Sequence, residues 1–420
     1  MNDSIVVVCN SKTIGHLWLD EQAHFTFQYD EDWLNDPDAT PLSLLHPLQT
    51  DPIKNDKTRV FFTHLLPEQE LKKIVARNLE IPVSDDFSLL GAIAGDCMGD
   101  ITLVPSESIL FVEDKERKTQ KYRLLSENDL ASSPQGWQPL FAGEEGVRLS
   151  VSGTVEKLPV YVDDQGIYLP VEGSVSSHVI KSDIPGHENS VLNELFCTEL
   201  AAKVGLPVLE GVLHDDLYLV SRSDRQRTKD GRVTRIHQED FCQLLDISPE
   251  ITSEKEGGAS LKQCFELVRR YSANPAIDMN LLLKWVLFSY LIGHQEATAK
   301  NLSFVWTAEG PRLAPFSDII SDAVYCGAGQ PLAMCIGSED RPSWIVTRRW
   351  ENFAKEVNIK SKYVILTLDE MARQIVGLAE CLVIEHFSKV SSDRIVASIQ
   401  QIIRTRSRNV LHNLKASSAH

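Results

Sequence analysis

Two segments in the carboxyl-terminal half of the chain carry the side chains best suited to chemistry. LIGHQEATAKN at residues 291–301 contains Glu296 and Asn301, and PFSDIIS at residues 315–321 places Asp318 between apolar flanks. A kinase-type site needs an Asn and an Asp for Mg²⁺ and a carboxylate near the acceptor hydroxyl. These segments therefore predict such a site, in which Glu296 stands where the base is expected.

A structural alternative exists for the same residues, namely a turn Asn and a helix-capping Asp. Polar groups in apolar company need partners, because leaving one buried and unpaired costs about 1–3 kcal/mol. Mg²⁺ would supply a partner by taking carboxylate and amide oxygens. Asn301 and Asp318 are accordingly candidate metal ligands next to Lys300, and the turn Asn and capping Asp stay open as the alternative.

The segment RLSVSGTVEK at residues 148–157 is rich in small and hydroxyl residues around Gly153. Such a loop can turn backbone N–H groups toward phosphate oxygens. It lacks the GxxxxGK[ST] pattern of a Walker loop, and an ordinary hairpin is the structural alternative.

Lys181 ends the apolar strand pattern of SHVIKSD and could reach phosphate. Glu194 in the next predicted helix could orient it, as a lysine–glutamate pair does in kinases. The alternatives are an edge lysine and a favourable charge near a helix amino terminus. The polar cluster His237, Gln238, Glu239 and Asp240 precedes Phe241, where an N-cap is the simplest explanation.

Particular elements must position these residues. The apolar run at 281–292 predicts a buried helix of about 18 Å, too short for a bilayer of about 30 Å. Gly293 breaks it before the polar loop, and a strand-like segment is expected to deliver Asp318. Strands up to about residue 221 and helices beyond residue 240 predict an α+β fold. We expect a small amino-terminal α/β subdomain at 1–145, a kinase amino-terminal lobe at 146–235 and a helical lobe at 236–420.

Composition argues against a nucleic-acid-wrapping protein, a zinc protein and a secreted protein. The 59 acidic and 42 basic residues give a net charge of −17, which argues against direct wrapping of nucleic acid. The eight scattered cysteines, without CxxC spacing, are typical of reduced, mostly buried thiols in a cytosolic protein rather than of a zinc site. The start MNDSIVVVCN lacks a basic n-region and predicts a strand, not a signal peptide.

The motifs together resemble the HipA kinases, the toxin components of bacterial toxin–antitoxin pairs. The resemblance spans essentially the whole chain, from FQYDEDWL, FFTHLLPE and DFSLLGAIAGDCMGDITLVP to SSHVIKSD, NELFCTELAAKVGLPV, HQEDFCQLL and LIGHQEATAKN. It implies a kinase-like fold and a cytoplasmic Ser/Thr protein kinase that uses ATP and Mg²⁺.

By this resemblance the site residues acquire roles. Glu296, Asn301 and Asp318 would be catalytic, and Ser150 and Ser152 would be sites of autophosphorylation. Residues implied to bind ATP phosphates are Ser152, Gly153, Thr154, Lys157, Lys181 and Lys300. Implied partners are a small helix-turn-helix antitoxin, which alone would touch DNA, and a protein substrate such as an aminoacyl-tRNA synthetase. No membrane association is implied.

This sequence departs from the family pattern at several positions. The family loop resembles G-N-x-D-x-H-x-K-N, whereas His294, Glu296 and Thr298 replace its Asn, Asp and His. The extra methylene of Glu moves the carboxylate by about an ångström, a shift that can cost on the order of 10²-fold in rate. Other departures are Val155 for Gln in the phosphate loop, and Ser221 and Ser223 in the hinge segment VSRSDR.

Two hypotheses follow. The retained Lys181, Asn301 and Asp318 favour an active kinase that phosphorylates a protein and its own loop serine. The replacements around Glu296 favour a pseudokinase that binds an antitoxin and nucleotide without transferring phosphate. Introduction of Glu296 to silence a toxic protein is a third explanation, disfavoured because flanking motif residues changed as well.

Overall fold

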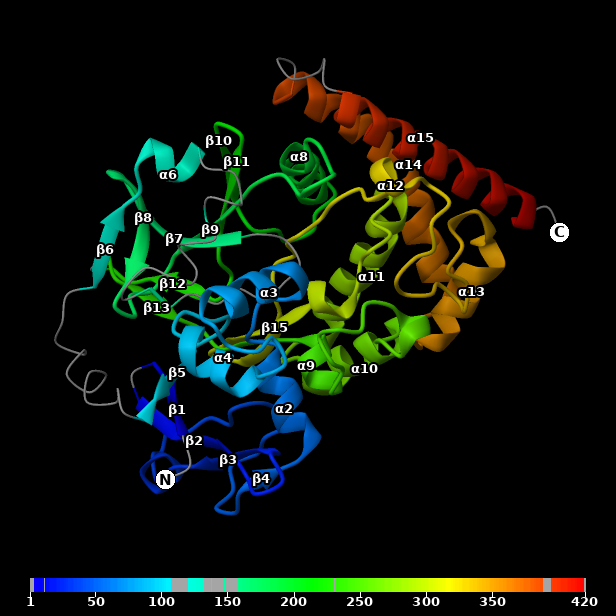
Figure 1. Cartoon of the computed structure of the whole chain (residues 1–420). Helices are drawn as coiled ribbons and strands as arrows, with labels where there is room; N and C mark the ends of the chain where they lie inside the picture. Colours follow the sequence, from blue (N-terminus) through cyan, green and yellow to red (C-terminus); the bar gives the residue numbers. More distant parts are fainter. Residues whose placement is uncertain are drawn as a thin grey trace. The chain divides into compact units, whose positions relative to one another are not determined.

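The computed structural model describes residues 4–10, 12–106, 120–131, 137, 147–148, 157–229, 231–387 and 394–418. The chain forms two compact units (Figure 1). Unit 1 comprises Met1–Ser182 and Leu219–Glu250, and unit 2 comprises Asp183–Tyr218 and Ile251–His420. Each unit thus combines two separate stretches of sequence. The expected boundaries near 145 and 235 both fall within unit 1, and the three-part division stays a prediction.

Unit 1 begins with a five-stranded antiparallel sheet. Its strands are β1 (Ser4–Cys9), β2 (Lys12–Leu19), β3 (Phe25–Tyr29), β4 (Ile53–Lys54) and β5 (Ile101–Pro105), in the order β4-β3-β2-β1-β5. The predicted small sheet in this region is confirmed. β1 is buried along nearly its whole length and pairs with β2 on one side and β5 on the other. Its apolar run IVVVC therefore fits a strand covered on both faces.

Short helices connect these strands. They are α1 (Glu31–Leu34), α2 (Asp56–Thr63), α3 (Gln69–Asn78) and α4 (Asp86–Ile93). Asp30, Asn55 and Asp85 cap α1, α2 and α4 by accepting backbone N–H groups, as short polar residues at the N-cap do. The Asp/Asn-rich character of this part of the sequence thus marks helix starts.

A second antiparallel sheet follows within unit 1. It contains β6 (Lys121–Leu124), β7 (Lys157–Asp163), β8 (Gly166–Val171), β9 (His178–Lys181) and β11 (Leu217–Ser221), in the order β11-β9-β7-β8-β6. Helix α6 (Glu127–Ala131) precedes β7. The unit is completed by β12 (Arg225–Arg227), β13 (Val233–Arg235), β14 (Gln238–Asp240) and α9 (Phe241–Leu245).

Unit 2 is mainly helical. Its α-helices are α8 (Ser190–Lys203), α10 (Leu261–Tyr271), α11 (Pro275–Ile292), α12 (Ala323–Cys326), α13 (Thr347–Glu356), α14 (Ser361–Glu385) and α15 (Arg394–Ser418). It also contains β10 (Gly211–His214), the hairpin β15 (Ser303–Thr307) and β16 (Gly310–Leu313), and 3₁₀ turns at Glu254–Glu256, Ala299–Asn301 and Pro342–Trp344. Sheets dominate unit 1 and helices unit 2, so the predicted α+β class is confirmed.

Helix α11 forms the centre of unit 2, where it packs against α10, α14 and α15 (Figure 1). Its sequence is apolar all around, and such a helix is stable only when it is surrounded. Most of its second half is buried, including Trp285, Phe288 and Leu291. In the described part of the chain, α11 is the one helix long and apolar enough to cross a membrane, and 61% of that stretch is buried inside the protein. The predicted buried helix is confirmed.

Candidate active site

The carboxyl end of α11 leads directly into the predicted catalytic loop. The helix ends at Gly293, whose left-handed φ of 83° is easily reached only without a Cβ. A Cβ at Gly293 would also lie 2.8 Å from the Cβ of Ala323. His294 N–H then bonds the Ser289 carbonyl at 2.9 Å, which folds the chain back over the helix end. The glycine that was expected to break the helix is thus required for both backbone conformation and space.

The loop separates a buried start from an exposed carboxylate. His294 and Gln295 are 4% and 2% exposed, whereas Glu296 is exposed. Thr298 and Asn301 then form a capping box around the 3₁₀ turn Ala299–Asn301, in which Asn301 Oδ1 accepts the Thr298 N–H at 2.9 Å. The carboxylate at the expected base position therefore faces solvent from a loop with a fixed backbone.

The β15–β16 hairpin carries the chain from Asn301 to Asp318. It is fixed to α11 by Asp278, which is fully buried and bonds the Arg312 guanidinium at 2.8 Å and the Leu313 N–H at 2.9 Å. Phe316 next stacks on Trp285, with ring centroids 5.9 Å apart. Both contacts tie the segment that precedes Asp318 to the same helix that delivers the loop.

Asp318 lies in an irregular segment, so the expectation of a strand at residues 315–321 was wrong. The one strand-like feature is an isolated parallel bridge between Val208 and Phe316. Asp318 itself has a left-handed φ of 54°, an unfavourable conformation for a residue with a Cβ. Strain of this kind costs about 1–3 kcal/mol and gathers at functional sites. No regular strand can accommodate it.

The acidic and basic groups around the loop influence one another. Partial shielding from solvent and the neighbouring Asp322 raise the pKa of Glu296, although its side chain stays exposed in part. Burial lowers the pKa of His294 to about 4, although Glu296 and Asp318 act in the opposite direction. Glu296 and Asp318 thus act on the same buried imidazole, which is neutral at physiological pH.

The residues of this loop system include the oxygen ligands that Mg²⁺ prefers. Asn301 Oδ1 accepts the Thr298 N–H at 2.9 Å and lies 3.4 Å from the Thr298 hydroxyl, and Asp318 contributes a partly buried carboxylate that accepts the Ser317 hydroxyl at 3.0 Å. Within the described ranges no group of three or more His, Cys, Asp or Glu side chains could hold a metal. One carboxylate and one amide oxygen, completed by phosphate and water, is the sparse protein contribution that Mg²⁺ usually receives.

Three important residues were missed by the sequence patterns. Asn193 on α8 is fully buried and exchanges two hydrogen bonds with the backbone of Ser321, at 3.1 and 2.9 Å. The Ser321 hydroxyl donates to the Ile292 carbonyl at 2.6 Å, and Asp322 Oδ2 accepts the Glu296 N–H at 3.0 Å. Only Asn193 had a signal in the sequence. It is a polar residue on the apolar face of a helix, three positions before Phe196 and four before Cys197.

The residues predicted to bind nucleotide in unit 1 are only partly described. Ser150, Ser152, Gly153, Thr154 and Val155 lie outside the described residues. Lys157 begins β7, and Lys181 ends β9 with 5% exposure. Glu194, the proposed partner of Lys181, belongs to α8 of unit 2. Their roles stay predictions.

The polar cluster before α9 has a structural role at its last residue. Asp240 caps α9 through a capping box with Gln243, which confirms the N-cap interpretation, and lies 3.0 Å from the ring of the buried His64. His237 bonds Asp100 at 2.7 Å and Glu239 at 3.3 Å. Burial alone would lower the pKa of His237, but the two carboxylates raise it to about 10. The imidazole is therefore a cation at neutral pH.

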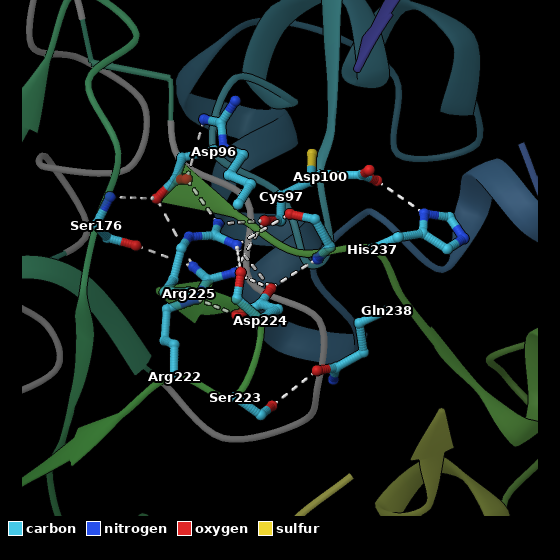
Figure 2. A network of polar contacts seen from close by, with 12 residues as sticks. Asp96, Cys97, Asp100, Ser176, Arg222, Ser223, Asp224, Arg225, His237 and Gln238 are labelled. Atoms are coloured by element: carbon cyan, nitrogen blue, oxygen red, sulfur yellow. Dashed lines mark hydrogen bonds and ion pairs between the residues drawn. The ribbon is translucent and has the colours of Figure 1, made fainter. Parts of the chain in front are cut away.

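The hinge segment VSRSDR supplies a buried ion network next to this cluster (Figure 2). Arg222 and Arg225 point toward Asp96 and Asp224, with guanidinium–carboxylate distances of 2.8 Å for Arg222–Asp224 and for Arg225–Asp96. Both guanidinium groups also donate to the carbonyl of Cys97. Ser223, one of the departures, bonds Gln238 at 2.7 Å instead. The charged residues of this segment are therefore committed to structure.

Known proteins resemble this chain over both units. Residues 5–104 match the HipA N-terminal domain model and residues 149–379 match the HipA-like C-terminal domain model. A putative kinase, Y4mE, of Sinorhizobium fredii is 35% identical over 83% of this chain and 84% of its own length. The Ser/Thr-protein kinase toxin HipA of Shewanella oneidensis is 29% identical over 86% of this chain and 85% of its own length.

A solved structure extends the likeness to three dimensions. HipA of Shewanella oneidensis MR-1, solved in a complex with HipB and operator DNA, covers 99% of this chain and 99% of its own with a TM-score of 0.83, at 24% identity. The predicted fold, a small amino-terminal subdomain followed by a kinase-like domain with a mainly helical carboxyl-terminal lobe, is confirmed. Since the family model covers more than half of the chain and a curated relative exceeds 30% identity over most of both lengths, this protein belongs to the HipA family of kinase toxins.

Proposed function

We propose that this protein is a Ser/Thr protein kinase that transfers phosphate from Mg·ATP to a protein substrate and to its own loop serines, Ser150 and Ser152. The observation that carries the proposal is the exposed Glu296 carboxylate on a backbone whose N–H is held by Asp322. A general base must be accessible to the acceptor hydroxyl and held in position. Glu296 meets both requirements.

The other residues have supporting roles. Asn301 and Asp318 would hold Mg²⁺, which when bound neutralises charge on the transferring phosphoryl group. Lys181, Lys300, Lys157 and the segment Ser152–Thr154 would contact phosphate. The raised pKa of Glu296 makes it a better proton acceptor than an ordinary carboxylate, because a higher pKa means a stronger base.

The substrate and partners are proposed from the relatives. A small HipB-like helix-turn-helix antitoxin would bind this chain, and operator DNA would be contacted through that antitoxin. The net charge of −17 supports this division, because the chain itself repels the DNA backbone. The protein substrate would be of the aminoacyl-tRNA synthetase class, and the compartment would be the cytoplasm, where the free cysteines stay reduced.

Phosphate on Ser150 and Ser152 tests the proposal. Purified protein is incubated with Mg·ATP, and the added mass is located by intact and peptide mass spectrometry. We expect one or two phosphates on the wild type and none on Glu296→Gln, which keeps size but removes the base. A wild type that gains no phosphate, together with a Glu296→Asp variant that does, would overturn the proposal.

A pseudokinase is the second candidate. The observation that favours it is the engagement of Asn301 Oδ1, which accepts the Thr298 backbone N–H at 2.9 Å and the Thr298 hydroxyl at 3.4 Å. The hydroxyl contact is the one added where Thr298 replaces the family's usual His. If that bond persists in the presence of Mg·ATP, the amide oxygen is less available to metal. The pseudokinase predicts thermal stabilisation by Mg·ATP without phosphate on any serine, and growth arrest that depends on Glu296 excludes it.

A further inference from the structure

Asp322 occupies the position of a helix cap but does not act as one. It precedes α12 and is 8% exposed, and a short acidic residue there normally accepts a backbone N–H of the first helical turn. Its backbone instead has helical angles, φ −64° and ψ −28°, and its side chain makes no capping hydrogen bond. The carboxylate is therefore available to a contact outside its own helix.

The carboxylate binds the backbone of the catalytic loop. Oδ2 accepts the N–H of Glu296 at 3.0 Å. Hydrogen bonds to an ionised acceptor are about twice as strong as neutral ones. The peptide N–H of the proposed base is thus held by one buried side chain.

Neighbouring backbone contacts extend this attachment. The Ala323 N–H bonds the Gly293 carbonyl at 3.1 Å, and the Ser321 hydroxyl bonds the Ile292 carbonyl at 2.6 Å. We call residues 321–323 the loop brace. Its three members contact the loop and the helix end before it, over residues 292–296. Asp322 is the member that reaches the base position.

Holding the loop requires the Asp322 carboxylate to be buried, which is unfavourable for a charged group. Burial raises its pKa to about 6, and Glu296 is a second carboxyl group close by. His187 and Cys326 also face this pair. Across the described ranges no Lys or Arg forms an ion pair with Asp322. A carboxylate kept for stability alone would be paired, because burying an unpaired charge is unfavourable. Its burial without a cation therefore indicates a task at the loop.

We infer that Asp322 is a positioning residue that fixes the backbone at 295–296, so that the longer Glu296 side chain presents its carboxylate at the acceptor hydroxyl. The inference rests on the proposed function. Glu has one more rotatable bond than Asp, and its carboxylate spreads over more positions unless the backbone beneath it is held. A misplacement of about an ångström costs on the order of 10²-fold in rate. The brace limits that loss.

Amide exchange of the full-length protein tests the brace independently of activity. We expect the N–H of Glu296 to exchange about tenfold faster or more in Asp322→Ala, because a hydrogen bond to a charged group is lost. Asp322→Asn keeps the volume and an acceptor oxygen, and should give an intermediate rate. Asp369→Ala, which removes a partly exposed carboxylate bonded to Arg373 on α14, is the matched control and should leave this rate unchanged.

Kinetics of phosphate transfer complete the test. In Asp322→Ala we expect kcat to fall by about 10²-fold while KM for ATP changes less than about twofold, with partial recovery in Asp322→Asn. Unchanged exchange in Asp322→Ala, or faster exchange with unchanged kcat, would overturn the inference. If the wild type transfers no phosphate while loop exchange still depends on Asp322, the proposed function fails and the brace stands.

Discussion

Two buried polar regions of this protein treat their charges in opposite ways. The ion network of unit 1 pairs each buried carboxylate with guanidinium groups. Asp96 lies 2.8 Å from Arg225 (Figure 2). It also lies 3.1 Å from Arg235. Despite burial, these cations hold the pKa of Asp96 and of Asp224 below the ordinary value. In unit 2 the Asp322 carboxylate accepts the Glu296 N–H, and the carboxyl groups of both residues have raised pKa values.

This difference in pairing distinguishes charges that stabilise the fold from charges suited to proton transfer. A paired network keeps its protonation states fixed, so it can hold the fold but cannot exchange protons near neutral pH. Carboxyl groups whose burial and like-charge neighbours raise the pKa are the groups suited to proton transfer. Among the described residues unit 1 has more buried charges, whereas the carboxyl groups that we propose for proton transfer lie in unit 2.

The largest effect should follow from breaking the network. Asp96→Ala removes the carboxylate shared by Arg225 and Arg235, so that Arg225 keeps only Asp224. Removal of one member of a buried ion pair costs about 3–5 kcal/mol. We expect a loss of this size in the free energy of unfolding, measured in denaturant. Asp96→Asn, of equal volume, should recover part of it. A loss below about 1 kcal/mol would show that the network is not structural.

The second largest effect is expected in the pH dependence of the free energy of unfolding, which differs between the two regions. The pKa of His237 is raised from 6.5 to about 10, so its contribution is complete below pH 6.5 and is lost as pH rises toward 10. We expect roughly a few kcal/mol of unfolding free energy to disappear over this window. His237→Gln should flatten the profile there. An identical slope in the variant would assign the loss to other groups.

Unit 2 should respond in a lower pH window. The pKa of Asp322 is raised from 3.8 to about 6, so the folded protein binds the extra proton and is most stable below pH 3.8 with respect to this group. Its contribution falls as pH rises from 3.8 to 6, by about 3 kcal/mol. Asp322→Asn removes this dependence. The contrast between the two regions is contradicted if the free energy of unfolding changes equally with pH in the variant and the wild type between pH 4 and 6.

The rate of phosphate transfer in Glu296 variants tests whether this unit 2 carboxylate is functional. If the extra methylene displaces the base, Glu296→Asp should increase the rate of loop-serine phosphorylation, by up to about 10²-fold. Glu296→Gln should abolish it, while the free energy of unfolding changes little because the side chain is exposed. Phosphate incorporation is followed by mass spectrometry over time. A Glu296→Asp variant slower than the wild type would mean that this loop has adapted to Glu.

The smallest effect is expected at the surface. Lys121 and Glu172 form an ion pair at 2.7 Å in which both side chains are about half exposed. Exposed pairs contribute about 0–1 kcal/mol. Lys121→Ala should therefore lower the free energy of unfolding by less than Asp96→Ala does, although each substitution breaks an ion pair. Equal losses would show that pairing, rather than burial, determines the cost.

Much of the fold and of the site could be predicted from local sequence. The uniformly apolar run before Gly293 has one physical solution in water, a buried helix, and Gly293 is needed for its left-handed end. The helix cap at Asp240 and the free cysteines follow equally from residue type and spacing. The order of the motifs was enough to indicate the HipA family, because each motif keeps its place along the chain.

Other features depend on residues distant in sequence, and no local pattern contains them. Asp318 takes a strained conformation that its apolar neighbours concealed, so a strand was expected where an irregular segment lies. The partners of Asp96 come from residues 222, 225 and 235, more than 120 positions away. Asp322 has the sequence appearance of an ordinary cap.

The sequence by itself thus determined the family, the buried helix and the identity of the loop that carries Glu296 and Asn301. Tertiary structure alone decided that the Asp322 carboxylate binds the Glu296 N–H at 3.0 Å instead of capping its own helix. The physical reason is that a capping bond and a loop bond need the same oxygen atoms. Which of them forms depends on where the end of α11 lies, and that position follows from packing rather than from the order of neighbouring residues.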